Sequence, residues 1–226
     1  MQCAVYVDFD GTIAPDEPTD ALFDKFADPA WRQIEKDWQE GRASSRDCME
    51  RQVALLRATP ERIDRFLARV EIDPMFPAFV RLCGRHGARV IVVSDGLDRV
   101  VGHVLRAAGL ELPYFANRLV WKGGERWSLQ FPYYRDDCRA TMGNCKCAHR
   151  REGASTLEIT VGDGRSDFCM AERSKVVLAK GQLAAHCTRM GVPHLQIEDF
   201  SDATRLIGRW FDSARQTYSS AAERLA

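Results

Sequence analysis

The sequence of 226 residues has no excess of charge of either sign, because 32 basic and 32 acidic residues balance at a pI of about 6.9. Proteins that bind nucleic acid or anionic lipid present a basic field or a polybasic stripe, and neither is found here. No apolar run approaches the roughly 20 residues that a membrane-spanning helix needs. We therefore expect no nucleic-acid partner and no membrane partner.

Internal repeats, low-complexity segments and the pattern of a secretory signal are also missing. The chain reaches charged residues within its first eight positions, which does not fit a signal peptide. Its 8 cysteines are scattered through a chain too long for a disulfide-stapled mini-protein. We expect reduced thiols and a cytoplasmic location, while the sequence leaves the oligomeric state, monomer or homodimer, open.

Short apolar runs alternate with helix-patterned stretches along most of the chain. The runs cover residues 3–7, 89–93, 157–161, 176–178 and 194–197, and the helical stretches cover 97–108, 165–173, 181–190 and 201–212. This alternation predicts an α/β fold with a Rossmann-like, doubly wound parallel sheet, in which ligands bind beyond the carboxyl ends of the strands. Residues 115–121 and 127–131 flank a glycine turn and predict an additional β-hairpin.

Residues 16–74 have a different character, because they are amphipathic, rich in Arg, Glu and Leu, and lack a strand-like run. Helical patterns cover residues 31–40, 45–57 and 60–70. Thr59 and Pro60 fit an N-cap and a first helical position. We predict a small helical domain over 16–74, inserted into a core domain formed by 1–15 and 75–226.

Two carboxylates, Asp8 and Asp10, follow the first predicted strand in the run Asp8-Phe-Asp-Gly-Thr12. Acids this close repel each other unless a cation lies between them or one is protonated. Mg²⁺ prefers oxygen ligands and would relieve the repulsion. The alternative is an acidic pair that only caps the following turn.

Further polar groups follow the later strands. Gly162-Asp163-Gly-Arg-Ser166-Asp167 supplies a second pair of acids, and Ser94-Asp95-Gly96 offers a hydroxyl and N–H groups at a strand-to-helix junction suited to phosphate. Lys146 precedes the strand at 157–161. Taken singly, these groups also fit an acidic turn, a helix cap and a solvated surface lysine.

The order of these groups along the chain resembles that of the haloacid dehalogenase superfamily, and the resemblance covers essentially the whole sequence. Its four motifs match, in turn, Asp8 with Asp10, Ser94, Lys146, and Asp163 with Asp167. The helical insertion corresponds to the C1 type of cap in that superfamily. The resemblance implies a Rossmann-like core, a helical cap and a phosphatase acting on a small phosphorylated metabolite.

The same resemblance implies a role for each matching residue. Asp8 would be the nucleophile, and Asp10 would protonate the leaving oxygen and later activate water. Mg²⁺ would be held by the Asp8 carboxylate, the Asp10 backbone carbonyl and Asp163, with Asp167 behind them orienting metal-bound water or Lys146. The phosphate group would be bound by Ser94, Asp95, Gly96, Ser166 and Lys146.

Two positions in the insertion bear on the substrate. Glu17 stands where the phosphoserine phosphatase branch has a glutamate for the substrate ammonium, whereas Gln52 replaces the arginine that grips its carboxylate there. A closer resemblance is to the 2-hydroxy-3-keto-5-methylthiopentenyl-1-phosphate phosphatases of methionine salvage, through Ser94-Asp95-Gly96, residues 115–117 and Gly143-Asn-Cys-Lys146. That enol phosphate or a related compound is the expected substrate, and phosphoserine is the alternative.

Alternatives of other classes stay open at this point. A phosphotransferase or mutase would pass the phosphoryl group to an acceptor other than water, and a binding module would keep the fold without catalysis. A zinc site is a further alternative, because three thiols and an imidazole occur together. These residues are Cys138, Cys145, Cys147 and His149.

Overall fold

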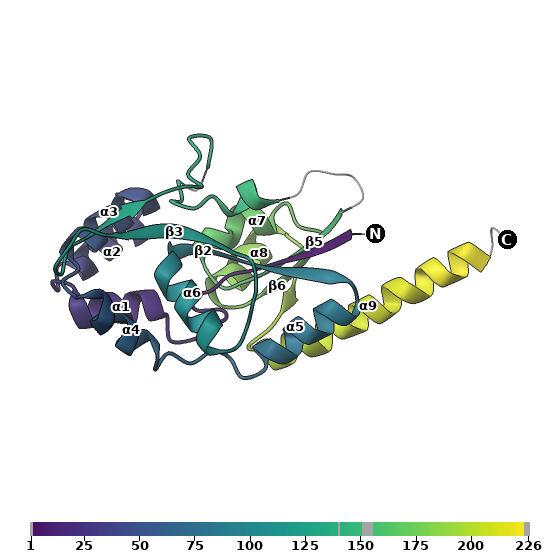
Figure 1. Ribbon diagram of the computed structural model, residues 1–226. Helices are drawn as coiled ribbons and strands as arrows, with labels where there is room; N and C mark the ends of the chain where they lie inside the picture. Colours follow the sequence, from purple (N-terminus) through teal and green to yellow (C-terminus); the bar gives the residue numbers. More distant parts are fainter. Residues whose placement is uncertain (1, 140, 151–155, 224–226) are drawn as a thin grey trace.

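A computed structural model describes residues 2–139, 141–150 and 156–223 of the chain (Figure 1). At its centre lies a seven-stranded sheet with the order β4-β3-β2-β1-β5-β6-β7. The strands are β1 (Gln2–Val7), β2 (Ala88–Leu97), β3 (Tyr114–Trp121), β4 (Trp127–Gln130), β5 (Thr156–Gly162), β6 (Val176–Ala179) and β7 (Leu195–Gln196). All neighbouring strands pair in parallel except β3 and β4, which form the predicted antiparallel hairpin. The predicted doubly wound α/β sheet is therefore confirmed.

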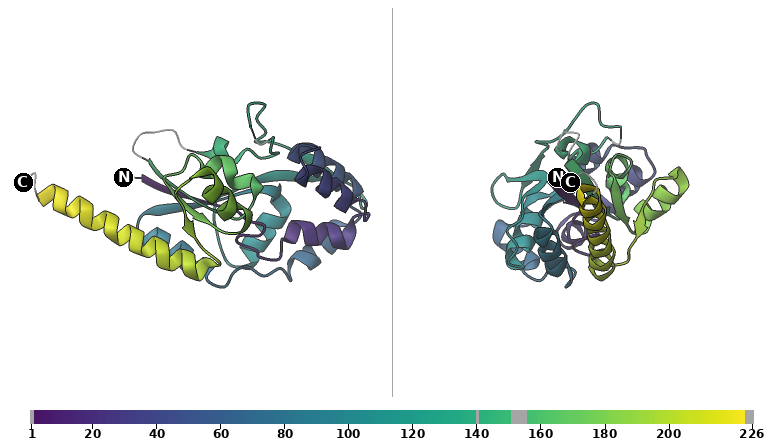
Figure 2. Two further views of the ribbon diagram at one scale, coloured as in Figure 1. Left: turned by 180° about the vertical axis from the view of Figure 1, so that it is seen from behind. Right: turned by 90° about the vertical axis from the view of Figure 1, so that its right-hand side faces the viewer.

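Helices cover both faces of this sheet (Figures 1 and 2). They are α1 (Pro18–Phe26), α2 (Trp31–Gln39), α3 (Ser45–Leu55), α4 (Pro60–Leu67), α5 (Phe76–Arg85), α6 (Asp98–Ala107), α7 (Phe168–Ala171), α8 (Gly181–Met190) and α9 (Phe200–Glu223), with the short 3-10 helices η1 (Lys146–His149) and η2 (Arg165–Asp167). Helices α5, α6 and α9 pack with one face, and α7 and α8 pack with the other. Strands buried on both faces explain why the sequence shows continuous apolar runs.

Strand β1 shows how the two faces are filled. Val5 and Val7 belong to the cluster that contains the residues of α5, α6 and α9, whereas Ala4 and Tyr6 pack with Met170 of α7. Successive side chains of a strand point to opposite faces, so each face receives every second residue. Because β1 pairs with both β2 and β5, its carboxyl end lies at the centre of the sheet.

Helices α1 to α4 come from the segment between β1 and α5 and lie together at one end of the sheet (left in Figure 1). Contacts of α3 with β4 and of α4 with α6 join them to the rest of the molecule. Thr59 caps α4, since its side chain accepts a bond from the Arg62 N–H at 3.4 Å. Ser44 caps α3 in the same way through the Asp47 N–H at 3.0 Å.

The structure differs from the sequence prediction in several elements. Helices α1 and α5 were not predicted as individual helices, and β2 continues past Ser94 to Leu97. The stretch predicted as a helix over 165–173 divides into η2 and α7. Helix α5 contains Pro77 and Gly84, which weaken a helical pattern, but burial of its apolar face against the sheet and α9 stabilises it.

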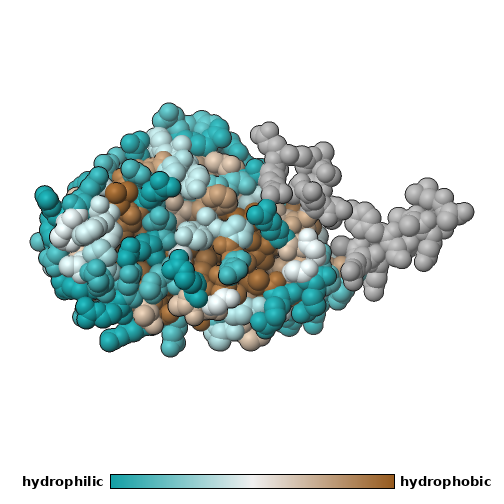
Figure 3. Space-filling view, in the orientation of Figure 1, coloured by the Kyte–Doolittle hydropathy of each residue, from teal (hydrophilic) through white to brown (hydrophobic). Residues whose placement is uncertain are grey.

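The face seen in Figure 3 is mostly hydrophilic, and apolar side chains gather toward its centre. Exposed large hydrophobic residues within the described part of the chain are few, and include Trp121 and Met190. Among the described helices, none combines the length and the apolar character that crossing a membrane would require.

Candidate active site

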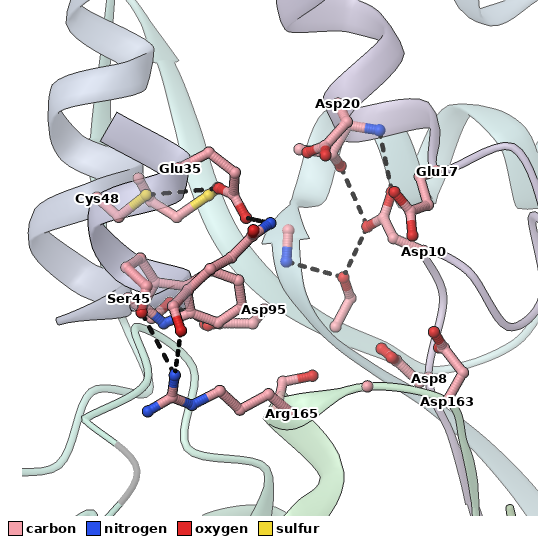
Figure 4. A pocket seen from close by; sticks show the side chains of 18 of the residues that line it. Asp8, Asp10, Glu17, Asp20, Glu35, Ser45, Cys48, Asp95, Asp163 and Arg165 are labelled. Atoms are coloured by element: carbon pink, nitrogen blue, oxygen red, sulfur yellow. Dashed lines mark hydrogen bonds between the residues drawn. The ribbon is translucent and has the colours of Figure 1, made fainter. Parts of the chain in front are cut away.

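A pocket of about 360 Å³ opens where the carboxyl ends of β1, β2 and β5 meet helices α1 to α3 (Figure 4). Most of the residues that the sequence singled out line this pocket. They are Asp8, Asp10, Glu17, Gln52, Ser94, Asp95, Gly96, Asp163 and Ser166. The other two, Lys146 and Asp167, lie behind the floor, where Lys146 contacts Asp8 and Asp167 contacts Lys146. The structure thus brings together residues from distant parts of the chain.

Lys146 bridges two carboxylates at the floor of the pocket. Its Nζ lies 2.6 Å from Asp8 Oδ1 and 2.7 Å from Asp167 Oδ1. All three side chains are buried. Burial acts to lower the pKa of Lys146, but the charges of Asp167 and Asp8 outweigh it and raise that pKa, so the lysine stays charged. A fixed cation therefore lies directly beside the end of β1.

Three carboxylates, from Asp8, Asp163 and Asp167, place oxygen atoms within 4.8 Å of one another. Burial and the charge of Asp167 raise the pKa of Asp8 well above its usual range, and the same two causes raise the pKa of Asp163 to about 6. One lysine does not balance three acids, so the group repels itself. Oxygen donors with excess negative charge are the donor set that suits a hard cation, and Mg²⁺ fits it.

The turn after β1 holds Asp163 close. Thr12 Oγ1 donates a hydrogen bond to Asp163 Oδ1 at 2.6 Å. Gly11 adopts a φ of 71°, and a Cβ atom there would lie 2.6 Å from Asp163 Oδ2. Only glycine meets both conditions without strain. The Asp8-Phe-Asp-Gly-Thr12 run thus provides the backbone turn as well as the two acids.

The Asp10 side chain points toward helix α1 and away from the three clustered carboxylates. Its Oδ1 accepts the backbone N–H of Thr19 at 2.9 Å, and its Oδ2 accepts Thr19 Oγ1 at 3.1 Å and Ser94 Oγ at 3.4 Å. Burial raises the pKa of Asp10, and the bonds from Thr19 oppose this rise. A carboxyl with a raised pKa that lines the pocket is suited to donate a proton. Gly96 is required beside it, because a Cβ there would lie 2.6 Å from Asp10 Oδ2.

Asp95 is a hub of hydrogen bonds within the protein. Its carboxylate accepts bonds from Ser45 Oγ in α3, from the Asn144 N–H at 2.6 Å and from Asn117 Nδ2 at 3.2 Å. Burial raises its pKa, and the bond from Ser45 acts in the opposite direction. These contacts occupy the Asp95 carboxylate, which would repel a phosphate; the contact predicted for residues 94–96 uses the Ser94 hydroxyl and backbone N–H groups. The geometry fits Asp95 as a support for its neighbour Ser94.

Asn144 connects Ser94 with the Lys146 segment. Its Nδ2 donates to Ser94 O at 2.8 Å and to Phe115 O at 3.0 Å, and its Oδ1 lies 2.7 Å from His149 Nε2. Asn144 is fully buried, so these bonds satisfy a polar group that would otherwise be costly. The motifs around residues 94–96, 115–117 and 143–146 meet in one network.

The insertion contributes Glu17 and Gln52 to the opposite end of the pocket. Glu17 precedes α1 with a left-handed backbone, φ 48° and ψ 64°. Gln52 is 1% exposed, and its Nε2 donates to Glu35 Oε2 at 2.9 Å. Among the described residues that line the pocket the only cation is Arg165, which donates to the backbone oxygens of Trp38 at 3.3 Å and Gln39 at 3.2 Å.

The alternative zinc site is not assembled. Within the described ranges, the one group of acids, histidines and cysteines with metal-ligating spacing is that of Asp8, Asp163 and Asp167. His149 stacks on Phe115 with ring centroids 4.3 Å apart. Cys147 hydrogen-bonds to Cys169, which lowers the pKa of Cys169 to about 6.

Several residues of the site were not found from the sequence. Thr12 and Asn144 lie within the motifs at residues 8–12 and 143–146, but the sequence pattern did not predict which side chains they contact. Thr19, Asp20 and Glu35 gave no signal, because a hydroxyl and two acids on amphipathic helices usually face solvent. Their importance follows only from the packing of the insertion over the strand ends.

Comparison with known proteins agrees with this geometry. Residues 5–172 match the family model of the haloacid dehalogenase-like hydrolases. A 2-hydroxy-3-keto-5-methylthiopentenyl-1-phosphate phosphatase of an Exiguobacterium species is 31% identical over 207 residues, which cover 89% of this chain and 95% of that protein. The Brevibacillus brevis protein of the same name is 27% identical, with 90% and 94% covered.

Solved structures show the same fold. A phosphoserine phosphohydrolase-like protein from Francisella tularensis superimposes with a TM-score of 0.69 at 17% identity, covering 92% of this chain and 100% of that one. A phosphoserine phosphatase carrying an analogue of the phospho-aspartyl intermediate gives 0.65 at 22% identity, covering 91% and 98%. With the motif residues gathered in one pocket and the family match spanning most of the sequence, the chain belongs to the haloacid dehalogenase-like hydrolases and is a phosphoric monoester hydrolase.

Proposed function

We propose that this protein is a Mg²⁺-dependent phosphatase that hydrolyses a small phosphorylated metabolite through an aspartyl phosphate on Asp8. The observation that carries the proposal is the position of the Asp8 carboxylate. It lies at the pocket floor, 2.6 Å from the Lys146 ammonium and within the group formed with Asp163 and Asp167. A nucleophile needs such surroundings when it attacks a phosphoryl group that is itself anionic.

The residues that would hold Mg²⁺ are Asp8 and Asp163, with the Asp10 backbone carbonyl beside them and Asp167 supporting the site through Lys146. When bound, the ion offsets the negative charge between the nucleophile and the phosphoryl oxygens. The fit rests on the three carboxylates and their mutual repulsion. Thr12 orients Asp163 through its hydrogen bond to Oδ1.

The reaction then follows from the positions of Asp8 and Asp10. An Asp8 oxygen forms a bond to phosphorus while the bond from phosphorus to the ester oxygen breaks, and Asp10 gives its proton to that leaving oxygen. Water next attacks phosphorus, Asp10 takes the proton of the water, and the bond between phosphorus and Asp8 breaks to release phosphate. Helix α1 orients Asp10 for both steps through Thr19.

Lys146 and Ser94 are suited to hold the phosphoryl oxygens during these steps. The lysine provides a buried positive charge, and the serine hydroxyl lies at the pocket wall beside Asp10. Ser166 lines the pocket on the β5 side and can add a further hydroxyl donor. Donors fixed in advance by the fold stabilise charge in the transition state without reorganising.

We also propose that residues 16–74 act as a cap domain over a core formed by 1–15 and 75–226. Glu17, Glu35 and Gln52 from this segment close the pocket opposite the catalytic floor. The arrangement leaves the chemistry to the core and the choice of leaving group to the cap.

The named relatives suggest the first compound to assay. Their enol phosphate has an uncharged leaving group, and at 24–31% identity a shared substrate is a hypothesis. Phosphoserine is the alternative, but no basic side chain stands at Gln52 to receive its carboxylate, and the nearest lining cation, Arg165, is engaged with backbone oxygens. A panel must therefore extend beyond both compounds.

The test of the proposed function is Asp8→Asn. This change keeps the size of the side chain and removes the nucleophilic carboxylate, so we expect phosphate release to fall by at least about four orders of magnitude while the protein stays folded. The control is Asp24→Asn, which alters an exposed ion pair with Arg32 outside the pocket. Unimpaired hydrolysis by the Asp8 variant would falsify the assignment.

The same assay separates a phosphatase from a phosphotransferase. Phosphate released with water as the sole acceptor supports hydrolysis. A requirement for an added alcohol or sugar acceptor would show that the phosphoryl group of Asp8 is normally passed on, and would exclude a simple phosphomonoesterase.

A further inference from the structure

The cap helices are joined to the core by polar contacts of different kinds. On the α4 side, Arg99 of α6 makes two hydrogen bonds to the Asp64 carboxylate, at 3.0 Å and 2.7 Å. Beside this pair, Trp127 Nε1 donates to Ala58 O at 2.8 Å. Bidentate pairs between opposite charges are among the stronger hydrogen bonds. This side of the cap therefore has more than one tie to the core, and one of them joins opposite charges.

Helix α2 is held to the core in another way. Its buried residues, Trp31 and Ile34, lie in its first half. At its other end Arg165 Nη1 donates to Trp38 O at 3.3 Å and to Gln39 O at 3.2 Å, and the guanidinium carbon lies 5.9 Å from the centroid of the Trp38 ring. In the ranges that the structure describes, the other hydrogen bonds and ion pairs of α2 go to residues of the cap itself. Arg165 thus provides the polar tie between this helix end and the core.

The contact made by Arg165 is suited to form and break repeatedly. The last turn of a helix leaves carbonyl oxygens without partners inside the helix, and the helix dipole favours a cation there. Both acceptors are uncharged, the two distances lie at the long end of the usual range, and Arg165 is exposed. Water can therefore take the place of either partner, so opening leaves no buried charge behind.

The core end of this contact lies in the turn that carries an acid of the active site. Arg165 begins η2, two residues after Asp163. In Figure 4 its side chain reaches from η2 toward the cap helices. Arg165, Trp38 and Gln39 all line the pocket, so breaking their contact would widen the pocket between η2 and α2.

We propose that Arg165 is a latch between core and cap. It holds the end of α2 against the turn after β5 while the ester is bound, and its release lets substrate and product pass between α2 and η2. The ties on the α4 side remain closed and act as the hinge. Arg165 is a positioning residue, since it acts on the wall of the pocket and leaves the phosphoryl group to the core. This inference rests on the proposed function, because it concerns access to the same site.

Hydrogen exchange followed by mass spectrometry tests the latch directly. Arg165→Met keeps an unbranched aliphatic side chain and removes the donors, so the backbone amides of α2 should exchange about fivefold faster, as for the loss of one hydrogen bond. Peptides from α4 should exchange as in wild type. The matched control is Arg99→Met, which removes an arginine tie on the other side of the cap and should speed exchange in α4 while leaving α2 unchanged.

Steady-state kinetics with p-nitrophenyl phosphate gives a second readout. When the closed pocket is less populated, apparent affinity falls in proportion, so KM of Arg165→Met should rise about fivefold. The value of kcat should stay within about twofold, because the catalytic groups belong to the core. Arg165→Lys keeps a cationic donor and should recover most of the loss. Arg173→Met changes an exposed core arginine that does not line the pocket, and should behave as wild type.

The outcomes separate the two proposals. Hydrolysis that survives Asp8→Asn overturns the function proposed for Asp8, and the exchange comparison still decides on the latch. Unchanged exchange in α2 of Arg165→Met, faster exchange spread equally over α2 and α4, or a fall of kcat without a rise of KM overturns the latch alone.

Discussion

Asp20 shows how the chemistry of one residue depends on its neighbours. The carboxyl lies on α1, lines the pocket and is surrounded by Glu35, Glu17 and Asp10. Its pKa in the folded protein is about 8 because burial and then the charge of Glu35 disfavour the ionised form. In an unfolded chain an aspartate titrates near ~3.9. Between these two pKa values, the folded protein therefore keeps a proton on Asp20 that the unfolded chain has released.

This difference predicts a pH dependence of stability. Since the folded pKa is the higher one, the free energy of unfolding should fall as the pH rises from about 4 to about 8. Asp20→Asn removes this contribution. Between about pH 5 and about pH 8, urea unfolding should show wild type losing at least about 1.4 kcal/mol relative to the variant, the equivalent of one pKa unit.

Asp24→Asn is the control for this experiment, because Asp24 lies on the same helix in an exposed ion pair with Arg32. Its stability should follow the pH dependence of wild type. Parallel curves for wild type and Asp20→Asn would show that Asp20 is ionised at neutral pH in the folded protein.

Individual residues also show where prediction from sequence stops. The acids Asp8 and Asp163 were predictable, because each directly follows a strand whose neighbours could be inferred. Asp95 also follows an apolar run, yet its carboxylate is bound by Ser45, 50 positions away, and by Asn144, 49 positions away. Contacts of this range depend on how the insertion packs, and no local pattern records them.

At the scale of elements, strands were easier to predict than helices. Residues 3–7 form a continuous apolar run, and residues 157–161 are buried throughout although they include Glu158 and Thr160, because strands in the middle of a parallel sheet are buried on both faces. Helix α5 has a weaker pattern and forms through contacts such as Phe76 and Phe79 with Phe200 of α9, with ring centroids 4.8 Å and 5.1 Å apart. Such tertiary stabilisation is absent from the local sequence.

Helix α3 is tied to the active site by its first residue. Ser45 Oγ donates to Asp95, whose carboxylate also receives the Asn144 N–H beside Lys146. Ser45→Ala would leave a buried carboxylate oxygen without this donor, at a cost of about 1–3 kcal/mol. We expect KM to rise by about tenfold, with a smaller change in kcat, in steady-state assays.

The matched control is Ser44→Ala at the preceding position. Ser44 caps α3 through the Asp47 N–H, so its loss should lower the free energy of unfolding by about 1 kcal/mol. KM should stay close to that of wild type, because Ser44 does not line the pocket. A similar rise of KM in both variants would mean that loosening of α3, and not the bond to Asp95, is responsible.

For the molecule as a whole, the active site lowers the stability of the folded state, because its carboxylates repel one another. The parallel sheet brings Asp8, Asp163 and Asp167 to one edge, and Lys146, with a smaller effect of Lys180 on Asp163, offsets their charge only in part. Real proteins depart from favourable local electrostatics mainly at functional sites. A ligand that binds only the folded chain and relieves the repulsion should therefore stabilise the entire fold.

Mg²⁺ should have this effect on thermal unfolding. At about one hundred times its Kd a ligand specific to the folded state adds ~2.7 kcal/mol, which for a chain of this size corresponds to a rise in Tm of about 5–10 °C. Asp163→Asn should lose most of this rise. Its Tm without Mg²⁺ should be at least that of wild type, because the amide oxygen can still accept from Thr12 while one charge is removed. Asp24→Asn should respond to Mg²⁺ as wild type does. An equal response in Asp163→Asn would mean that the ion stabilises the protein elsewhere, and that the carboxylates at the strand ends do not form its site.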